Sequence, residues 1–234
     1  MNMTDNKKNI VVTGAAQGLG KEIAVQLSGN PGYKLILIDL DENELKETAE
    51  SVGAEFYHCD VSNPDQIDAL INVLLENFKH IDVLINNAGV MLTGPIDSYA
   101  YDLIKKTIEV NTLGTMYFSR AVVPSMKSHK SGVILNVIST AGLTGKAERS
   151  IYNASKWAIT GFTESLNAEL SGFGISVLGI YPSLINTNLF KNAGIEKDMS
   201  NSLDPSEVSK VVEFMLSFDR MQMTKVVLKD INHI

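Results

Sequence analysis

Residues 9–20 read NIVVTGAAQGLG, and this stretch decides the fold. A β-branched run typical of a buried strand leads directly into a turn that contains three glycines. Leu19, Ile23, Ala24 and Leu27 then follow at helical spacing. A strand, a glycine turn and a helix in this order predict a unit whose helix N-terminus offers free N–H groups and a positive dipole end to a phosphate. Three glycines alone are equally consistent with an ordinary tight turn.

Each glycine of this turn has its own physical interpretation. Gly14 lets the chain turn sharply, Gly18 lets the backbone approach a pyrophosphate, and Gly20 allows close packing of the helix. The spacing Gly-x-x-x-Gly-x-Gly differs from that of the common dinucleotide-binding fingerprint, so the agreement is one of mechanism.

Strand and helix patterns alternate along the rest of the chain. The predicted strands span residues 9–13, 34–40, 55–59, 82–86, 132–139, 175–181 and 225–229. The predicted helices span residues 18–28, 42–51, 63–78, 99–110, 112–128, 151–172 and 205–218. Such alternation is typical of βαβ units and parallel sheets. We therefore predict an α/β fold over residues 1–234: a single doubly wound Rossmann-type domain, with a mainly parallel sheet of about seven strands and helices on both faces.

The overall composition excludes several classes of protein. The chain has 234 residues, of which 44% are hydrophobic, and a formal net charge of −7, which argues against a nucleic-acid-binding surface. The polar N-terminus is unlike a signal peptide and no apolar run is long enough to span a membrane, so we expect a cytoplasmic protein with no membrane partner. His58, His80, His129 and His233 are scattered, and we expect no metal site.

Asp39 ends the second predicted strand, nineteen residues after Gly20. A carboxylate at this place can accept hydrogen bonds from both hydroxyls of an adenosine ribose, and it would repel a 2′-phosphate. The residue therefore favours NAD(H) over NADP(H). The alternative is an aspartate that caps the next helix, which Asp41 could also do.

Polar residues also follow the next two strands. Asp60 and Val61 come after the third strand, and Asn87, Ala88 and Gly89 come after the fourth. Ligands of open parallel sheets bind at the carboxyl ends of the strands, so we expect the first pair near an adenine and the second group under the cofactor. Each residue alone is equally consistent with a turn.

Tyr152 and Lys156 are four residues apart in a predicted helix and share one face of it. An ammonium near a phenol favours the phenolate and lowers its pKa toward the range of general acid–base catalysis. Ser139, at the end of the fifth strand, could hold a reacting carbonyl oxygen. The alternative is that Tyr152 is a core aromatic residue with a chance lysine neighbour.

Together these motifs resemble the short-chain dehydrogenase/reductase family. The resemblance spans nearly the whole chain and rests on TGAAQGLG at 13–20, Asp39, NNAG at 86–89, Asn111 in VNTLG, Ser139 in VIST, and Tyr152-x-x-x-Lys156. It implies that Tyr152 is the catalytic acid or base, that Lys156 lowers its pKa and binds the nicotinamide ribose, and that Ser139 polarises the substrate carbonyl. It also implies that Asn111, in a kinked helix, holds a water that links Lys156 to solvent.

The resemblance further implies a full set of cofactor-binding residues. These are Gly14, Gln17, Gly18, Leu19, Gly20, Asp39, Asp60, Val61, Asn87, Ala88, Gly89, Tyr152, Lys156, Pro182, Ile185 and Thr187. The neutral Gln17 agrees with Asp39 in favouring NAD(H).

Two features depart from the family pattern. Ser183 stands where members commonly have glycine, at the start of the predicted substrate loop, residues 183–203. The C-terminus, residues 225–234, lacks the glycine-rich ending of many members, which affects the contacts by which they form tetramers. The resemblance still implies a homodimer or homotetramer, with residues 112–128 and 151–172 as contact faces.

The expected function is hydride transfer between NAD(H) and a small-molecule secondary alcohol or ketone. The alternative is a non-catalytic NAD(H)-binding redox sensor, which would not need Asn111, Ser139, Tyr152 and Lys156 together. Further alternatives concern single segments. Residues 146–149 face either a polar substrate or solvent, Met91 either lines a pocket or packs beneath it, and Trp157 is better explained by core or subunit packing than by substrate contact.

Overall fold

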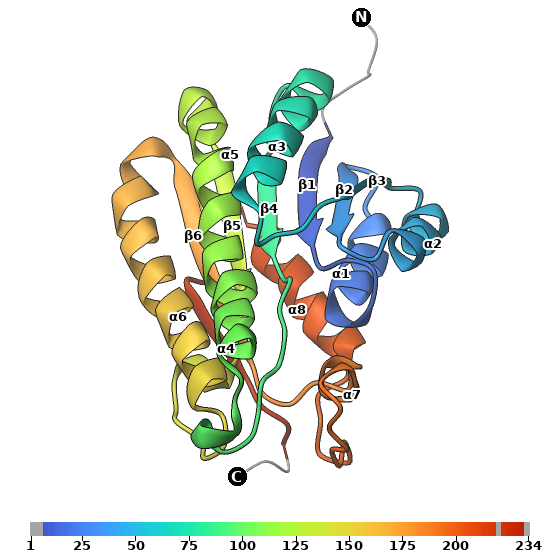
Figure 1. Cartoon of the computed structure of the whole chain (residues 1–234). Coiled ribbons are helices and arrows are strands. Elements are labelled where there is room, and N and C mark those ends of the chain that lie inside the picture. The colour runs from blue at the N-terminus through green and yellow to red at the C-terminus, as the bar shows by residue number, and fades with distance from the viewer. Residues whose placement is uncertain (1–6, 219–220, 232–234) are drawn as a thin grey trace, which may run out of the picture.

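The computed structural model describes residues 7–218 and 221–231 and contains one seven-stranded sheet, in which every pair of neighbouring strands is parallel (Figure 1). The strands are β1 (Lys8–Thr13), β2 (Tyr33–Asp39), β3 (Glu55–His58), β4 (Val83–Asn86), β5 (Gly132–Val137), β6 (Ile175–Pro182) and β7 (Lys225–Leu228). Their order across the sheet is β3-β2-β1-β4-β5-β6-β7. The predicted doubly wound α/β fold is confirmed, and its sheet is wholly parallel where a mainly parallel one was expected.

Helices cover both faces of the sheet. They are α1 (Gly18–Ser28), α2 (Glu42–Val52), α3 (Pro64–Phe78), α4 (Tyr101–Ile108), α5 (Thr115–His129), α6 (Ser150–Leu170), α7 (Leu189–Asn192) and α8 (Pro205–Leu216). Successive strand residues point to opposite faces, so Ile10 and Val12 pack with α1, α2 and α8, whereas Val11 packs with α3, α5 and α6. Figure 1 shows α3, α5 and α6 side by side across one face.

Local sequence signals account for several helix starts. Asp41 accepts a hydrogen bond from the Glu44 N–H, and Asn63 accepts from the Asp65 and Gln66 N–H groups. Pro64 and Pro205 occupy the first turns of α3 and α8, as predicted, because proline lacks the N–H that has no partner there.

The segment between α4 and α5 differs from the prediction. Two separate helices, 99–110 and 112–128, were expected, but the π-helical segment Glu109–Gly114 joins α4 to α5 without a break. Its extra residue brings Gly114 against Val61, where an added Cβ would lie 2.9 Å from the Val61 carbonyl oxygen. The short helix α7 was not predicted, because its four residues are too few to show periodicity.

The strand order reverses direction between β1 and β4, and their carboxyl ends define the crevice in which open parallel sheets bind ligands. Thr13 ends β1 and Asn86 ends β4. This edge of the sheet therefore positions the glycine turn and the NNAG segment next to each other.

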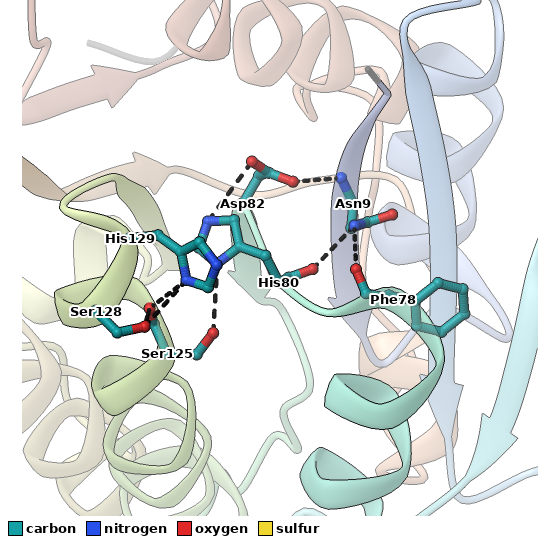
Figure 2. A network of polar contacts seen from close by, with 7 residues as sticks. All are labelled: Asn9, Phe78, His80, Asp82, Ser125, Ser128 and His129. Carbon is teal, nitrogen blue, oxygen red and sulfur yellow. Dashed lines mark hydrogen bonds and ion pairs between the residues drawn. The ribbon is translucent and has the colours of Figure 1, made fainter. Parts of the chain in front are cut away.

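The opposite, amino edge carries a separate polar network (Figure 2). The rings of His80 and His129 stack with centroids 4.0 Å apart, and His80 Nε2 lies 3.6 Å from Asp82 Oδ1. Asp82 Oδ2 accepts a 2.8 Å hydrogen bond from the Asn9 N–H, which ties the start of β1 to the start of β4. This network is at the end of the sheet remote from the crevice.

Candidate active site

A cavity of about 560 Å³ opens at the carboxyl edge of the sheet. Its walls come from residues that follow β1, β2, β3, β4, β5 and β6, together with α6 and the segment 182–201. All of the predicted cofactor-binding residues except Gly20 line this cavity, and Ser139 lines it too. Of the predicted site residues, only Gly20 and Asn111 do not line it.

The glycine turn is shaped by close backbone approach. Gly14 has φ +66°, and a Cβ on it would lie 2.7 Å from Ala88 Cα. A Cβ on Gly20 would collide with the Gly14 carbonyl oxygen. Gly20 thus allows the packing predicted for it, beneath the turn and outside the cavity wall.

Asn87 holds this turn in place. Its side-chain Nδ2 donates hydrogen bonds to the carbonyl oxygens of Thr13 at 3.1 Å and Gly14 at 2.9 Å. The Thr13 hydroxyl in turn accepts from the N–H groups of Asn87 and Ala88. The side-chain N–H groups of Asn87 therefore make their hydrogen bonds within the protein.

The N-terminus of α1 has no side-chain cap. Gln17 is extended at the N-cap position and makes no capping hydrogen bond, which leaves the first N–H groups of the helix for a ligand. Instead, Gln17 Oε1 accepts a 3.2 Å hydrogen bond from Asn192 Nδ2, which joins the glycine turn to α7. Ile185 pairs with Leu203 in an isolated β-bridge, so residues 186–202 form one loop at the cavity.

Two carboxylates mark the other end of the cavity. Asp39 Oδ2 accepts a 2.9 Å hydrogen bond from the Ala16 N–H, and Oδ1 accepts from the N–H groups of Leu40 and Asp41. Because Asp41 caps α2, Asp39 is not needed for that task. Asp60 Oδ1 accepts both the N–H and the hydroxyl of Ser62.

Tyr152 and Lys156 lie on one face of α6 and are both buried, with 5% and 6% of their surfaces exposed. The Ser139 side chain lies close enough to Tyr152 to favour its ionised form. Lys156 Nζ lies 5.9 Å from the centre of the Tyr152 ring and donates a 3.2 Å hydrogen bond to the Val137 carbonyl. The three residues meet at the cavity wall.

Burial is the largest influence on the pKa values of Tyr152 and Lys156. It raises the pKa of Tyr152, against smaller lowering effects of the Ser139 hydrogen bond and the Arg149 charge. Burial also lowers the pKa of Lys156 to about 8. The expected lowering of the Tyr152 pKa by Lys156 is therefore not met in this structure, because desolvation of the phenolate outweighs the nearby positive charges.

Asn111 lies in the π-helical segment, beneath the cavity wall. Its Oδ1 accepts a 2.7 Å hydrogen bond from the Val90 N–H, and its Nδ2 donates to the Val90 carbonyl and to Ser155 Oγ. The Thr115 hydroxyl donates to its backbone carbonyl. These contacts give Asn111 a positioning role for Val90.

Several cavity residues were not predicted as site residues. Lys106, Lys146, Arg149 and Lys197 line the cavity, as do Met91 and Phe190, which pack with Tyr152. The charged run 146–149 was visible in the sequence, which left open whether it faces a polar substrate or solvent. Lys197 and Phe190 lie in an irregular segment and carried no pattern. Met91 both lines the cavity and packs against Tyr152. Trp157 is half exposed and lies outside the core of this chain.

Over residues 7–218 and 221–231, no group of three histidine, cysteine or acidic side chains is arranged to hold a metal ion. His233, the first six residues and the end of the atypical C-terminus lie outside the described residues. Within the same ranges, none of the helices combines the length and the hydropathy needed to cross a membrane.

Comparison with known proteins decides the family. The family model described as short chain dehydrogenase matches residues 8–198. The chain belongs to the short-chain dehydrogenase family. The expected family and its nucleotide-binding fold are thereby confirmed.

Relatives of this short-chain dehydrogenase are oxidoreductases. An uncharacterised oxidoreductase of Staphylococcus saprophyticus is 33% identical over 215 residues, covering 89% of this chain and 91% of the relative. A trans-4-hydroxycyclohexanecarboxylate dehydrogenase of Sinomonas cyclohexanicum is 30% identical over 234 residues, covering 93% of this chain and 89% of the relative. These relatives give no support to a non-catalytic sensor.

Solved structures of the family bind both nicotinamide dinucleotides. A serine dehydrogenase complexed with NADP⁺ matches with a TM-score of 0.88 at 28% identity, covering 94% of each chain. A Burkholderia phymatum short-chain dehydrogenase in complex with NAD matches with a TM-score of 0.85 at 27% identity, covering 97% of this chain and 90% of the other.

Proposed function

We propose that this short-chain dehydrogenase transfers hydride between NAD(H) and a secondary alcohol or ketone, with Tyr152 as the general acid or base. The observation that carries the proposal is the buried Tyr152 at the wall of the cavity, with Ser139 beside it and Lys156 Nζ 5.9 Å from the centre of its ring. A relative named for the oxidation of a secondary alcohol, trans-4-hydroxycyclohexanecarboxylate, supports the substrate class.

The residues present fit a nicotinamide dinucleotide. The uncapped N-terminus of α1 would take the diphosphate, Asp39 the adenosine ribose, and Asp60 with Val61 the adenine. Ile185 and Thr187 line the same cavity and would contact the nicotinamide. When bound, this cofactor supplies or accepts the hydride.

The side chains of the protein handle the proton and the developing charge. In the reduction, the Tyr152 hydroxyl donates a proton to the substrate oxygen while the Ser139 hydroxyl hydrogen-bonds to that oxygen. With a pKa near 8, Lys156 is mainly an ammonium at neutral pH and stabilises the phenolate that remains. In the oxidation, the same groups act in reverse.

NAD(H) is the proposed nucleotide because of Asp39. Its carboxylate is held by the glycine turn through the Ala16 N–H, so a 2′-phosphate would meet a fixed negative charge. Isothermal titration should give a Kd for NADH at least about tenfold lower than for NADPH, and Asp39→Ser should reduce that ratio. Equal affinities in the wild type would contradict this preference.

Assembly and location are part of the same proposal. Trp157 on α6 and Leu103 on α4 are each about half exposed, and α4 packs against α6. This apolar surface would be covered in a cytoplasmic homodimer or homotetramer. Light scattering of the wild type and of Trp157→Glu tests it: the variant should dissociate, and a monomeric wild type would contradict it.

The reaction itself is tested by a panel of ketones and secondary alcohols with NADH, NADPH and their oxidised forms. We expect a change in absorbance at the wavelength of the reduced nicotinamide with at least one pair. Firm binding of NADH without turnover of any compound would contradict the proposed function.

A further inference from the structure

Positive charge is concentrated at one end of the cavity. Lys106, Lys146, Arg149 and Lys197 line it in addition to Lys156, although the chain as a whole carries a net charge of −7. Lys146 and Arg149 precede α6 and Lys197 belongs to the segment above the cavity, and the fold brings these three charges close to one another, whereas Lys106 lies on α4.

Arg149 links this charge to the reacting group. It is the residue just before α6 and lies three positions before Tyr152. Its guanidinium lies 5.3 Å from the centre of the Phe190 ring, and its charge acts directly on Tyr152. Arg149 and Tyr152 line the same cavity, so an anion held by Arg149 would lie on the substrate side of the reacting group.

Lys146 and Lys197 extend the positive charge away from Tyr152. Burial lowers the pKa of Lys146, and the nearby charges of Arg149 and Lys197 lower it further. None of these three side chains makes a salt bridge with an acidic group in the part of the chain that the structure describes. Arg149 and Lys146 are two like charges placed together with no salt-bridge partner among the described residues, which favours the binding of an anion from outside.

Among the acidic residues of the cavity, only Asp198 lies near this cluster, and it interacts with Lys197. Asp39 and Asp60 lie at the opposite end, where the adenosine would bind. Asp198 is the exception: its two oxygens accept the N–H and hydroxyl of Ser200, and its charge also interacts with that of Lys197. The carboxylate of Glu148 does not line the cavity.

The turn that carries Arg149 is well fixed. Glu148 has φ +60°, and its carbonyl accepts hydrogen bonds from the Gly94 N–H at 2.8 Å and the Thr93 hydroxyl at 2.7 Å. The Tyr99 hydroxyl lies 3.2 Å from the same oxygen. The cation next to the reacting group is thus held from the segment that follows NNAG, and it is not on a free loop.

We propose that the substrate is a small ketone or secondary alcohol that carries an anionic group, carboxylate or phosphate, bound by Arg149 and Lys146 beside Tyr152. This inference rests on the proposed function. The apolar wall of Met91, Leu184 and Phe190 would contact the carbon skeleton between the anion and the carbonyl. In the reduction, the carbonyl carbon gains the hydride of NADH, its oxygen gains the proton of Tyr152, and the nucleotide leaves as NAD⁺.

Two matched pairs of compounds test the inference. The carboxylate 4-oxopentanoate is compared with its methyl ester, and dihydroxyacetone phosphate is compared with dihydroxyacetone. With NADH, at least one charged compound should have a kcat/KM about 10- to 100-fold above that of its uncharged partner, because a charge-assisted hydrogen bond is lost in the partner. The pair that shows the preference distinguishes carboxylate from phosphate.

The variant Arg149→Gln should reduce that ratio by about tenfold or more, mainly through KM of the charged compound, and Arg149→Lys should restore part of it. Arg120→Gln is the matched control, because Arg120 pairs with Asp68 and does not line the cavity. It should leave the ratio unchanged.

The two possible failures are distinguishable. Turnover of the uncharged compounds at equal or higher kcat/KM, with a ratio that Arg149→Gln does not change, would overturn the anionic substrate and leave the proposed function intact. No turnover of these compounds or of any uncharged ketone or alcohol, with NADH or NADPH, would overturn both.

Discussion

The side-chain amide of Asn111 pairs with the backbone of Val90: Oδ1 accepts its N–H at 2.7 Å and Nδ2 donates to its carbonyl at 3.0 Å. Val90 follows the NNAG segment at the cavity wall, and Asn111 is placed by the π-helical segment between α4 and α5. A residue expected from family resemblance to hold a water is thus seen to hold the chain that lines the cavity.

The pairing predicts the effect of Asn111→Ala. Two largely buried backbone groups would lose their partners, so the free energy of unfolding should fall by about 2–4 kcal/mol. Urea denaturation measures this change. Asn111→Asp keeps the acceptor and loses the donor, and should give an intermediate value. A loss below about 1 kcal/mol for the alanine variant would contradict the positioning role.

Lys156 predicts a rise of stability with pH. Its folded pKa is about 8, below the ordinary lysine value of 10.5, so the unfolded chain binds more protons between these two values. The free energy of unfolding should therefore increase from about pH 8 to pH 10, by up to ~3 kcal/mol from this residue. Denaturation at several pH values measures it for the wild type, Lys156→Met and Lys105→Met.

In Lys156→Met that rise should be absent, whereas in Lys105→Met, which removes an exposed lysine of α4, it should remain. A rise of the same size in Lys156→Met would show that other groups cause it.

His80 predicts a loss of stability at acidic pH. Burial lowers its pKa, and His129 lowers it further, although Asp82 opposes them. A histidine with a lowered folded pKa contributes stability above its unfolded value of about 6.5, and this contribution is lost as the pH falls. The wild type should therefore lose more stability between pH 7.5 and pH 5 than His80→Gln does, as measured by thermal or urea unfolding.

His58→Gln is the control for this experiment, because His58 is exposed on β3 and should leave the slope unchanged. Equal slopes for the wild type and His80→Gln would be evidence against a buried His80.

Ser139 is in a backbone conformation that favours glycine, with φ +151° and ψ 158°. Holding a residue other than glycine there costs about 1–3 kcal/mol. Because both variants lose the hydroxyl and its bond to the Ala141 N–H, comparing Ser139→Gly with Ser139→Ala isolates the strain. The glycine variant should be more stable by about 1–2 kcal/mol after its greater unfolded-state entropy is included.

Both Ser139 variants should lose most of their turnover. A glycine variant that is less stable than the alanine variant would contradict strain at this residue, and one that retains wild-type turnover would contradict the role of the hydroxyl.

The order of strands and helices was predictable because it depends on local signals. Buried strands appear as short β-branched runs, and Asn63-Pro64 begins a helix through contacts within one turn. The glycine turn was predictable for the same reason, since its positive φ angles at Gly14 and Gly18 are a local backbone feature that favours glycine.

Features that depend on contacts between distant segments were not predictable from one sequence. Gly114 in the π-helical segment packs on Val61, about fifty residues earlier in the chain, and this contact has no local signal. The positive end of the cavity combines Lys106, Arg149 and Lys197, none of which shares a motif. The upward shift of the Tyr152 pKa follows from burial, which spacing along a helix does not show.

The central claim is that the Tyr152 hydroxyl carries the proton in hydride transfer, and Tyr152→Phe tests it most directly. Turnover of a working substrate and the Kd of NADH are measured in the same preparation, with Tyr117→Phe as a control outside the cavity. We predict that kcat falls by about 10²- to 10⁴-fold in Tyr152→Phe while the Kd of NADH changes little. Turnover at the wild-type rate in that variant would contradict the account.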